Sequence, residues 1–80
     1  MKPQTITITG WTKKDGSWIP YKSDKHTITR VAEAWEKLEA KAHEFIDSGR
    51  LPNAEIQVTD KLILVEGMNE KITIVKEEDK

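Results

Sequence analysis

The sequence predicts an α+β domain with the element order ββαβββ, in which one amphipathic helix packs on one face of a five-stranded antiparallel or mixed sheet. Three observations lead to this prediction. A helix-period apolar stripe occupies the middle of the chain, apolar and polar residues alternate before and after it, and short turn-rich segments join the alternating runs. The 80 residues form a single domain, 1–80, with the opposite sheet face partly exposed.

The first two strands are expected at residues 5–11 and 17–22, where side chains alternate between two faces. A three-residue loop, 14–16, with a bulge at Gly16 would pair Trp11 with Ile19. A four-residue loop, 13–16, would instead pair Trp11 with Trp18. The longer loop also pairs Gly10 with Ile19 and Ile8 with Tyr21. Only this second register places four apolar side chains on one buried face, so we prefer it: Ile6, Ile8, Ile19 and Tyr21.

The helix is expected at about residues 28–48, because apolar residues there recur at alternating spacings of three and four. Thr27 or Thr29 is the expected N-cap, since a hydroxyl can accept a hydrogen bond from the first turn. Gly49 is expected to end the helix in the left-handed conformation. The stripe consists of Ile28, Val31, Trp35, Leu38, Ala42, Phe45 and Ile46.

Three further strands are expected at residues 54–58, 62–65 and 72–75. The register that pairs Val58 with Ile63 and Val65 with Ile72 directs six side chains to the helix: Ile56, Val58, Ile63, Val65, Ile72 and Ile74. A shift of one residue would exchange the two faces of 62–65, and in either case that run is apolar on both. One strand order compatible with this pattern is 2-1-5-4-3, antiparallel throughout, but the sequence alone does not fix the order. The tail at 77–80 is expected to fray.

The outer sheet face is therefore the predicted partner-binding surface, since exposed apolar patches mark interaction sites. Two alternatives are a cross-strand tryptophan pair that only stabilises the hairpin, and a bulge at Gly10 that turns Trp11 into the core. The predicted surface comprises Trp11, Lys13, Lys14, Trp18, Pro20, Lys22, Leu62, Leu64 and Val75.

Composition excludes several classes of protein. The chain contains no cysteine and therefore has no disulfide, thiol nucleophile or thiolate metal ligand. The absence of cysteine is compatible with the reducing cytoplasm in which we expect the protein. The first residues lack an apolar run of the signal-peptide type, and the longest aliphatic run, 62–65, is too short for a membrane span. Residues 1–30 carry net charge +4 and the others −5. This asymmetry indicates either an acidic partner or internal balance between the hairpin and the helix.

No catalytic pattern is present, and we expect neither an enzyme nor a cofactor, metal or small-molecule substrate. His43 lies four residues from both Glu39 and Asp47, a spacing that metal sites use but that solvent-exposed helix faces produce more often. His26 lies in a polar segment without a nucleophile motif.

Two function classes follow. The first is a protein-binding module, acting on another protein or as a homodimer. An inhibitor that occludes a host protein, of phage or mobile-element origin and comparable to an anti-CRISPR factor, suits this size. The second is a nucleic-acid-binding module using the basic aromatic hairpin 11–22. With Glu33, Trp35 and Glu36 in the following helix, this hairpin resembles the arm-binding domain of tyrosine recombinases over residues 5–45. It lacks that domain's third strand, and the chain is not assigned to that family.

Overall fold

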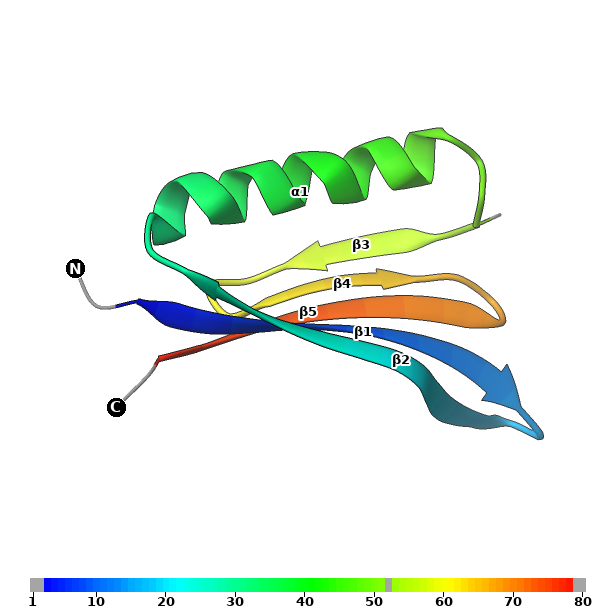
Figure 1. The fold of residues 1–80 in the computed structure, drawn as a ribbon. Coiled ribbons are helices and arrows are strands. Elements are labelled where there is room, and N and C mark those ends of the chain that lie inside the picture. Colours follow the sequence, from blue (N-terminus) through cyan, green and yellow to red (C-terminus); the bar gives the residue numbers. More distant parts are fainter. Residues whose placement is uncertain (1–2, 52, 79–80) are drawn as a thin grey trace.

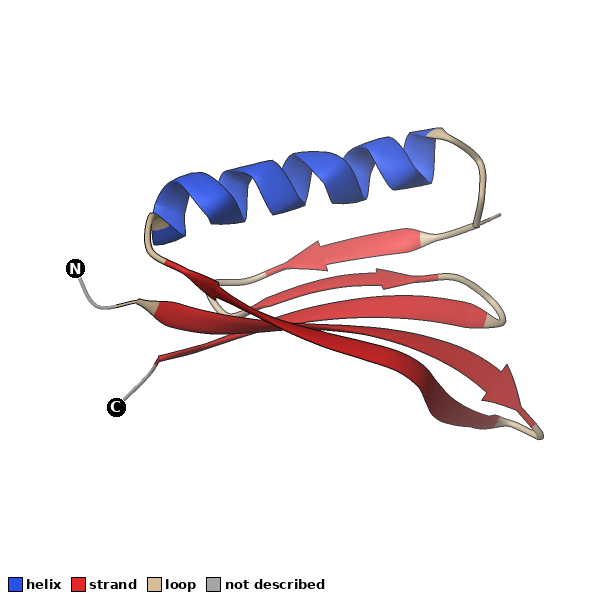
Figure 2. Ribbon diagram, viewed as in Figure 1, coloured by secondary structure: helices blue, strands red, loops and turns tan. Residues whose placement is uncertain are grey.

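The computed structural model describes residues 3–51 and 53–78 as one helix and five strands (Figures 1 and 2). Two long strands form the first hairpin, the helix follows, and three strands complete the chain. The bounds are β1 Gln4–Lys14, β2 Ser17–Ile28, α1 Val31–Asp47, β3 Glu55–Val58, β4 Leu62–Glu66 and β5 Glu70–Glu78.

The antiparallel pairing of all neighbouring strands confirms the predicted α+β class with a five-stranded sheet. The strand order, which the sequence left open, is β2-β1-β5-β4-β3. In the second half of the sheet the register is also as predicted, with Val58 opposite Ile63 and Val65 opposite Ile72. In this register Ile63 and Val65 of β4 lie on the buried helix side, while Leu62 and Leu64 of the same strand lie half-buried on the outer face.

The helix lies over one half of the sheet, against β3 and β4 (Figure 1). Five strands spaced about 4.8 Å apart span about 19 Å, whereas one helix covers about 10 Å. The core therefore concentrates beneath α1, where Ile63 is fully buried. The other buried apolar residues are Ile6, Ala42, Leu51, Val65 and Ile74. On the helix-side face, the part of the first hairpin nearest its turn is left uncovered, as the exposure of Ile19 and Tyr21 shows.

The first hairpin differs from its predicted register. Its turn is the two-residue pair Asp15 and Gly16, with φ of 52° and 80°, the left-handed conformations of a tight hairpin turn. Lys13 consequently lies opposite Trp18, and Trp11 opposite Pro20. An Asp-Gly pair is a stronger hairpin signal than the apolar alternation that favoured the four-residue loop.

A β-bulge at Tyr21 reverses the sheet face to which the following residues of β2 point, relative to the predicted alternation. Gly10 lies opposite Lys22 and Trp11 opposite Pro20, so Tyr21 is the extra residue. Lys22 is thereby placed on the helix side, and its predicted place on the outer face is wrong. The prediction that Ile19 and Tyr21 join the core is also wrong: both are on the helix side, but 42% and 63% exposed because α1 does not reach them.

The ends of two elements differ from expectation. The helix begins at Val31 rather than about residue 28, with Arg30 as an N-cap that makes no side-chain capping bond. Ile28 ends β2 instead, where it packs against the core. Gly49 follows the helix with φ of 75°, as predicted. Residues 77 and 78 belong to β5 rather than to a frayed tail, and residues 79–80 lie outside the described part.

Candidate functional site

Both hairpin tryptophans lie on the outer face, half-buried and held by their own neighbours. The indole Nε1 of Trp11 donates a 3.0 Å hydrogen bond to Thr73 Oγ1. The Nζ of Lys71 is 5.0 Å from the ring centroid of Trp11 and 4.6 Å from that of Trp18. Lys13 Nζ approaches the Trp18 ring at 5.4 Å. The cluster is similar to the predicted alternative of a tryptophan pair that only stabilises the hairpin, although here Lys71 contacts both rings in place of a direct ring–ring pair.

The three aliphatic members of the predicted surface lie elsewhere on the same face. Leu62 is opposite Val75, and Leu64 is opposite Thr73, all at half-buried positions. Thr73 separates Leu64 from β1, where Thr9 is its partner. The outer face therefore carries an aliphatic group on β4 and β5 and an aromatic group on the hairpin, with threonine between them.

The turn-side part of the first hairpin, residues 11–22, is called the distal hairpin and presents apolar side chains on both of its faces. Trp11, Trp18 and Pro20 point to the outer side, while Ile19 and Tyr21 point to the helix side. The Tyr21 ring lies over Gly10, where an added Cβ would come within 2.8 Å of the ring. Since β2 is an edge strand, nothing in the described chain packs beyond it. The exposure of Ile19 and Tyr21 could have been predicted from the number of elements, because one helix is too narrow to cover five strands.

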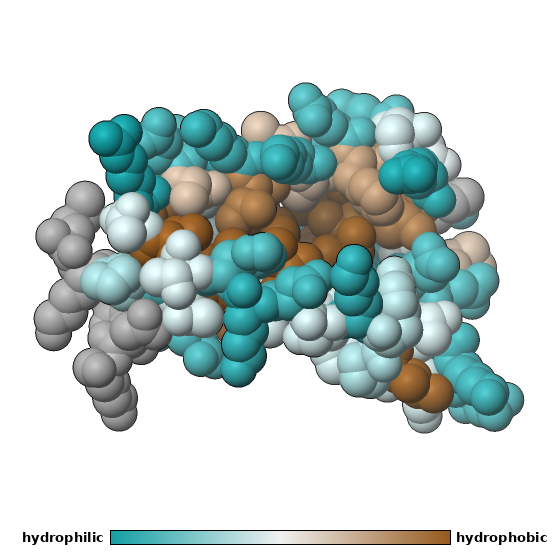
Figure 3. Space-filling model, viewed as in Figure 1, coloured by the Kyte–Doolittle hydropathy of each residue, from teal (hydrophilic) through white to brown (hydrophobic). Residues whose placement is uncertain are grey.

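A hollow lined by hydrophobic side chains separates α1 from the sheet (Figure 3). It measures about 200 Å³ and lies where the helix begins to leave the sheet uncovered. The sequence contained a signal for it, because Ala42 is the smallest residue of the buried stripe between Leu38 and Phe45. The cavity lining comprises Leu38, Lys41, Ala42, Phe45, Ile63, Val65, Ile72 and Ile74.

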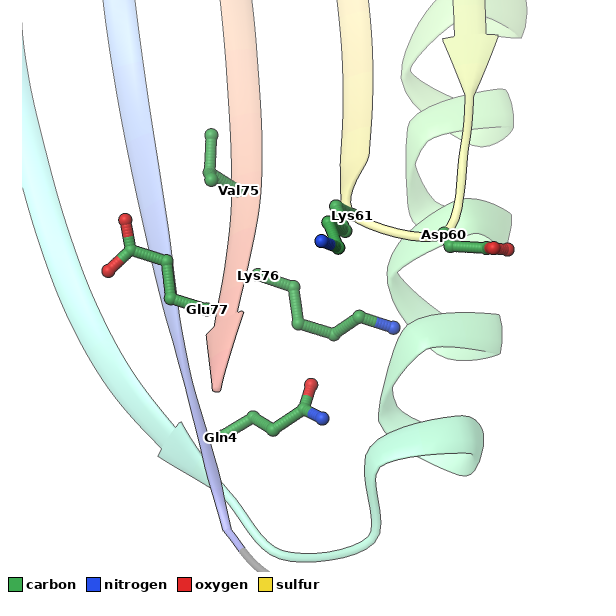
Figure 4. A pocket seen from close by; sticks show the side chains of 6 residues that line it. All are labelled: Gln4, Asp60, Lys61, Val75, Lys76 and Glu77. Atoms are coloured by element: carbon green, nitrogen blue, oxygen red, sulfur yellow. The ribbon is translucent and has the colours of Figure 1, made fainter. Parts of the chain in front are cut away.

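A second, open basin of about 600 Å³ lies at the end of the sheet near the start of β1 (Figure 4). Its lining combines two lysines, Lys61 and Lys76, with the carboxylates of Asp60 and Glu77. Gln4 and Val75 complete the lining. The Gln4 Oε1 atom is buried and has no hydrogen-bond partner among the described residues. Lys76 Nζ is 4.4 Å from the ring centroid of Trp35, whose Nε1 donates to the Thr59 carbonyl at 3.3 Å. The lining contains no nucleophile paired with a base.

In residues 3–51 and 53–78, no group of three His, Asp or Glu side chains is arranged to bind a metal ion. Both His26 and His43 are exposed. The helix of the described part, α1, is not long and apolar enough to cross a membrane.

Charges of the hairpin and helix do not balance one another through direct contact. Lys22 pairs with Asp24 within β2, at 3.9 Å. Glu33 pairs with Arg30 at 3.6 Å and with Lys37 at 3.9 Å. In the described part of the chain no ion pair connects β2 to α1.

Comparisons with protein-family models, with curated proteins and with solved structures found no match to this chain. Its function is therefore inferred from the chemistry of its own surfaces.

Proposed function

We propose that this protein is a non-enzymatic binding module that docks a protein partner on its distal hairpin, residues 11–22. The observation that carries the proposal is the exposure of Ile19 and Tyr21, 42% and 63%, on a hairpin that is apolar on both faces. Large apolar side chains grouped at one uncovered element are typical of interaction surfaces. Tyrosine and tryptophan are also enriched among residues that dominate binding energy.

Preorganisation supports the same surface. Trp11 is fixed by its hydrogen bond to Thr73, and both tryptophan rings contact Lys71. Side chains that are already ordered lose little rotamer entropy when a partner binds. The hairpin is therefore suited to act as a rigid wedge rather than as a flexible loop.

The charge of the hairpin tip favours an acidic rim on the partner. Lys13 and Lys14 are exposed and form no ion pair within residues 3–51 and 53–78. The aliphatic group of Leu62, Leu64 and Val75 offers additional area on the outer face to a larger partner. Occlusion of a partner's own site, as by a small inhibitor in the cytoplasm, needs no further chemistry than this.

Nucleic-acid binding is the alternative, and the arrangement of the tryptophans weighs against it. Bases stack on open aromatic faces. Here Lys71 lies over both rings and Lys13 over one. A stacked base would have to displace these lysines, whereas a protein partner can use Ile19 and Tyr21 without disturbing the cluster.

The test compares capture from the native host by wild type and by the double variant Ile19→Ser/Tyr21→Ser. Val58→Thr, on the far edge strand and 38% exposed, is the matched control. We expect one protein to be retained by wild type and Val58→Thr and lost by the double variant, with all three folded by circular dichroism. Reconstitution with the purified partner must then show the same order of affinities.

Two further results would contradict the proposal. Equal retention of the purified partner by the double variant would remove the hairpin as the site. Binding to DNA or RNA that weakens steeply with salt, with no protein partner retained, would favour the nucleic-acid alternative. Sedimentation of wild type and double variant distinguishes a second copy of this chain from a foreign partner.

A further inference from the structure

We propose that the cavity beneath α1 binds a small amphiphilic carboxylate, with an apolar body about the size of a benzene ring and the carboxylate near Lys41. This site is separate from the hairpin surface. Seven of its eight lining residues are apolar, and the eighth, Lys41, contributes mainly its methylene stem.

The size of the cavity fits such a ligand. An apolar cavity of about 150 Å³ in a protein core is large enough to bind benzene. The cavity here measures about 200 Å³ and is open on the uncovered side of the helix (Figure 3). A planar ring can therefore enter without the helix separating from β4.

Ala42 creates this space. It is 7% exposed and lies between Leu38 and Phe45 on the buried face of α1. Across the cavity, Ile63 and Val65 of β4 and the isoleucines of β5 form the opposite wall. A larger residue at position 42 would fill the hollow from the helix side.

Lys41 determines the polar end of the ligand. It is exposed, lies next to Ala42, and takes part in none of the ion pairs of the described residues. By contrast, Lys37 one turn earlier pairs with Glu33 at 3.9 Å. A lysine whose stem lines an apolar opening can turn its ammonium group toward an anionic head group while the stem contacts the ligand's ring.

The test uses hydrocinnamate as the carboxylate probe and hydrocinnamyl alcohol as its neutral counterpart. Each is titrated to about 10 mM while the methyl resonances of Ile63 and Ile72 are followed by NMR. We expect saturable methyl shifts with hydrocinnamate and weaker binding of the alcohol. Ala42→Leu should abolish both, whereas Ala40→Leu on the exposed face of the helix should bind as wild type.

The head-group assignment has its own pair of variants. Lys41→Gln should weaken hydrocinnamate binding by about fivefold and leave the alcohol unchanged, because one exposed ion pair is lost. Lys37→Gln is the control and should leave both affinities unaltered. Equal affinity of wild type for acid and alcohol would overturn the carboxylate assignment.

The site itself is overturned if wild type shows no saturable shift at Ile63 and Ile72. It is also overturned if folded Ala42→Leu retains wild-type affinity. Should Ala42→Leu fail to fold, Ala42→Val replaces it. Nuclear Overhauser contacts between the probe's ring protons and the Ile63 methyls in wild type then provide the direct test, and their absence at saturation counts against the site.

Discussion

The indole Nε1 of Trp11 donates a 3.0 Å hydrogen bond to the hydroxyl of Thr73, across 62 positions of sequence. This bond fixes a large aromatic ring against the outer face of the sheet and joins the first hairpin to the last strand. It explains how a tryptophan that points away from the core remains half-buried.

Replacing Thr73 by valine should destabilise the protein by about 1–2 kcal/mol, because a partly buried indole N–H would lose its acceptor. Urea unfolding measures the difference. Thr7→Val on the same face is the control and should change stability by less than about 0.5 kcal/mol. Equal effects of the two substitutions would mean that the Trp11–Thr73 bond contributes nothing.

Gly10 and Tyr21 should be coupled. An added Cβ at position 10 would meet the end of the tyrosine ring at 2.8 Å, so Gly10→Ala must displace that ring. In a Tyr21→Ser background the clash is absent, and alanine should stabilise the strand by about 0.5–1 kcal/mol relative to glycine. In the wild-type background this gain should disappear.

A double-mutant cycle by urea unfolding measures this coupling, which we expect to be about 1 kcal/mol. Additive effects of Gly10→Ala and Tyr21→Ser would show that the ring does not rest on Gly10 in solution.

The hairpin turn depends on Gly16, whose φ is +80°. Gly16→Ala should cost about 1–2 kcal/mol, because a side chain disfavours the left-handed conformation. The Cβ would meet nothing within 4 Å, so the cost is conformational rather than steric contact with a neighbour. Asp15→Asn should be neutral or slightly stabilising, since Asn-Gly suits the same turn. Thermal unfolding of both variants checks this order, and a neutral Gly16→Ala would contradict the two-residue turn.

Two isoleucines that the sequence assigned alike to the core should differ greatly in their effect on stability. Ile63 is fully buried, so Ile63→Ala should cost about 2–5 kcal/mol. Ile19 is 42% exposed, and Ile19→Ala should cost less than about 1 kcal/mol. Similar losses in denaturant unfolding would indicate that Ile19 is covered in solution.

Much of the fold could be predicted from local pattern. The spacing of Trp35, Leu38, Ala42 and Phe45 predicted the helix, and the apolar positions of the last three strands predicted their register. The order of the strands in the sheet was not predicted. These predictions succeeded because each element must bury one face, and its sequence period alone defines that face. Gly49 could be placed for a similar reason, since a left-handed residue after a helix favours glycine.

The candidate surface required the tertiary structure. A bulge at Tyr21 moved Lys22 to the helix side, and no periodicity marks where a strand gains one residue. The exposure of Ile19 and Tyr21 follows from where α1 lies across the strands, and so does the cavity beneath Ala42. Outside the bulge, sequence alone determined which side chains face the helix. Only packing decided which of them the helix covers, because one helix is about half as wide as five strands.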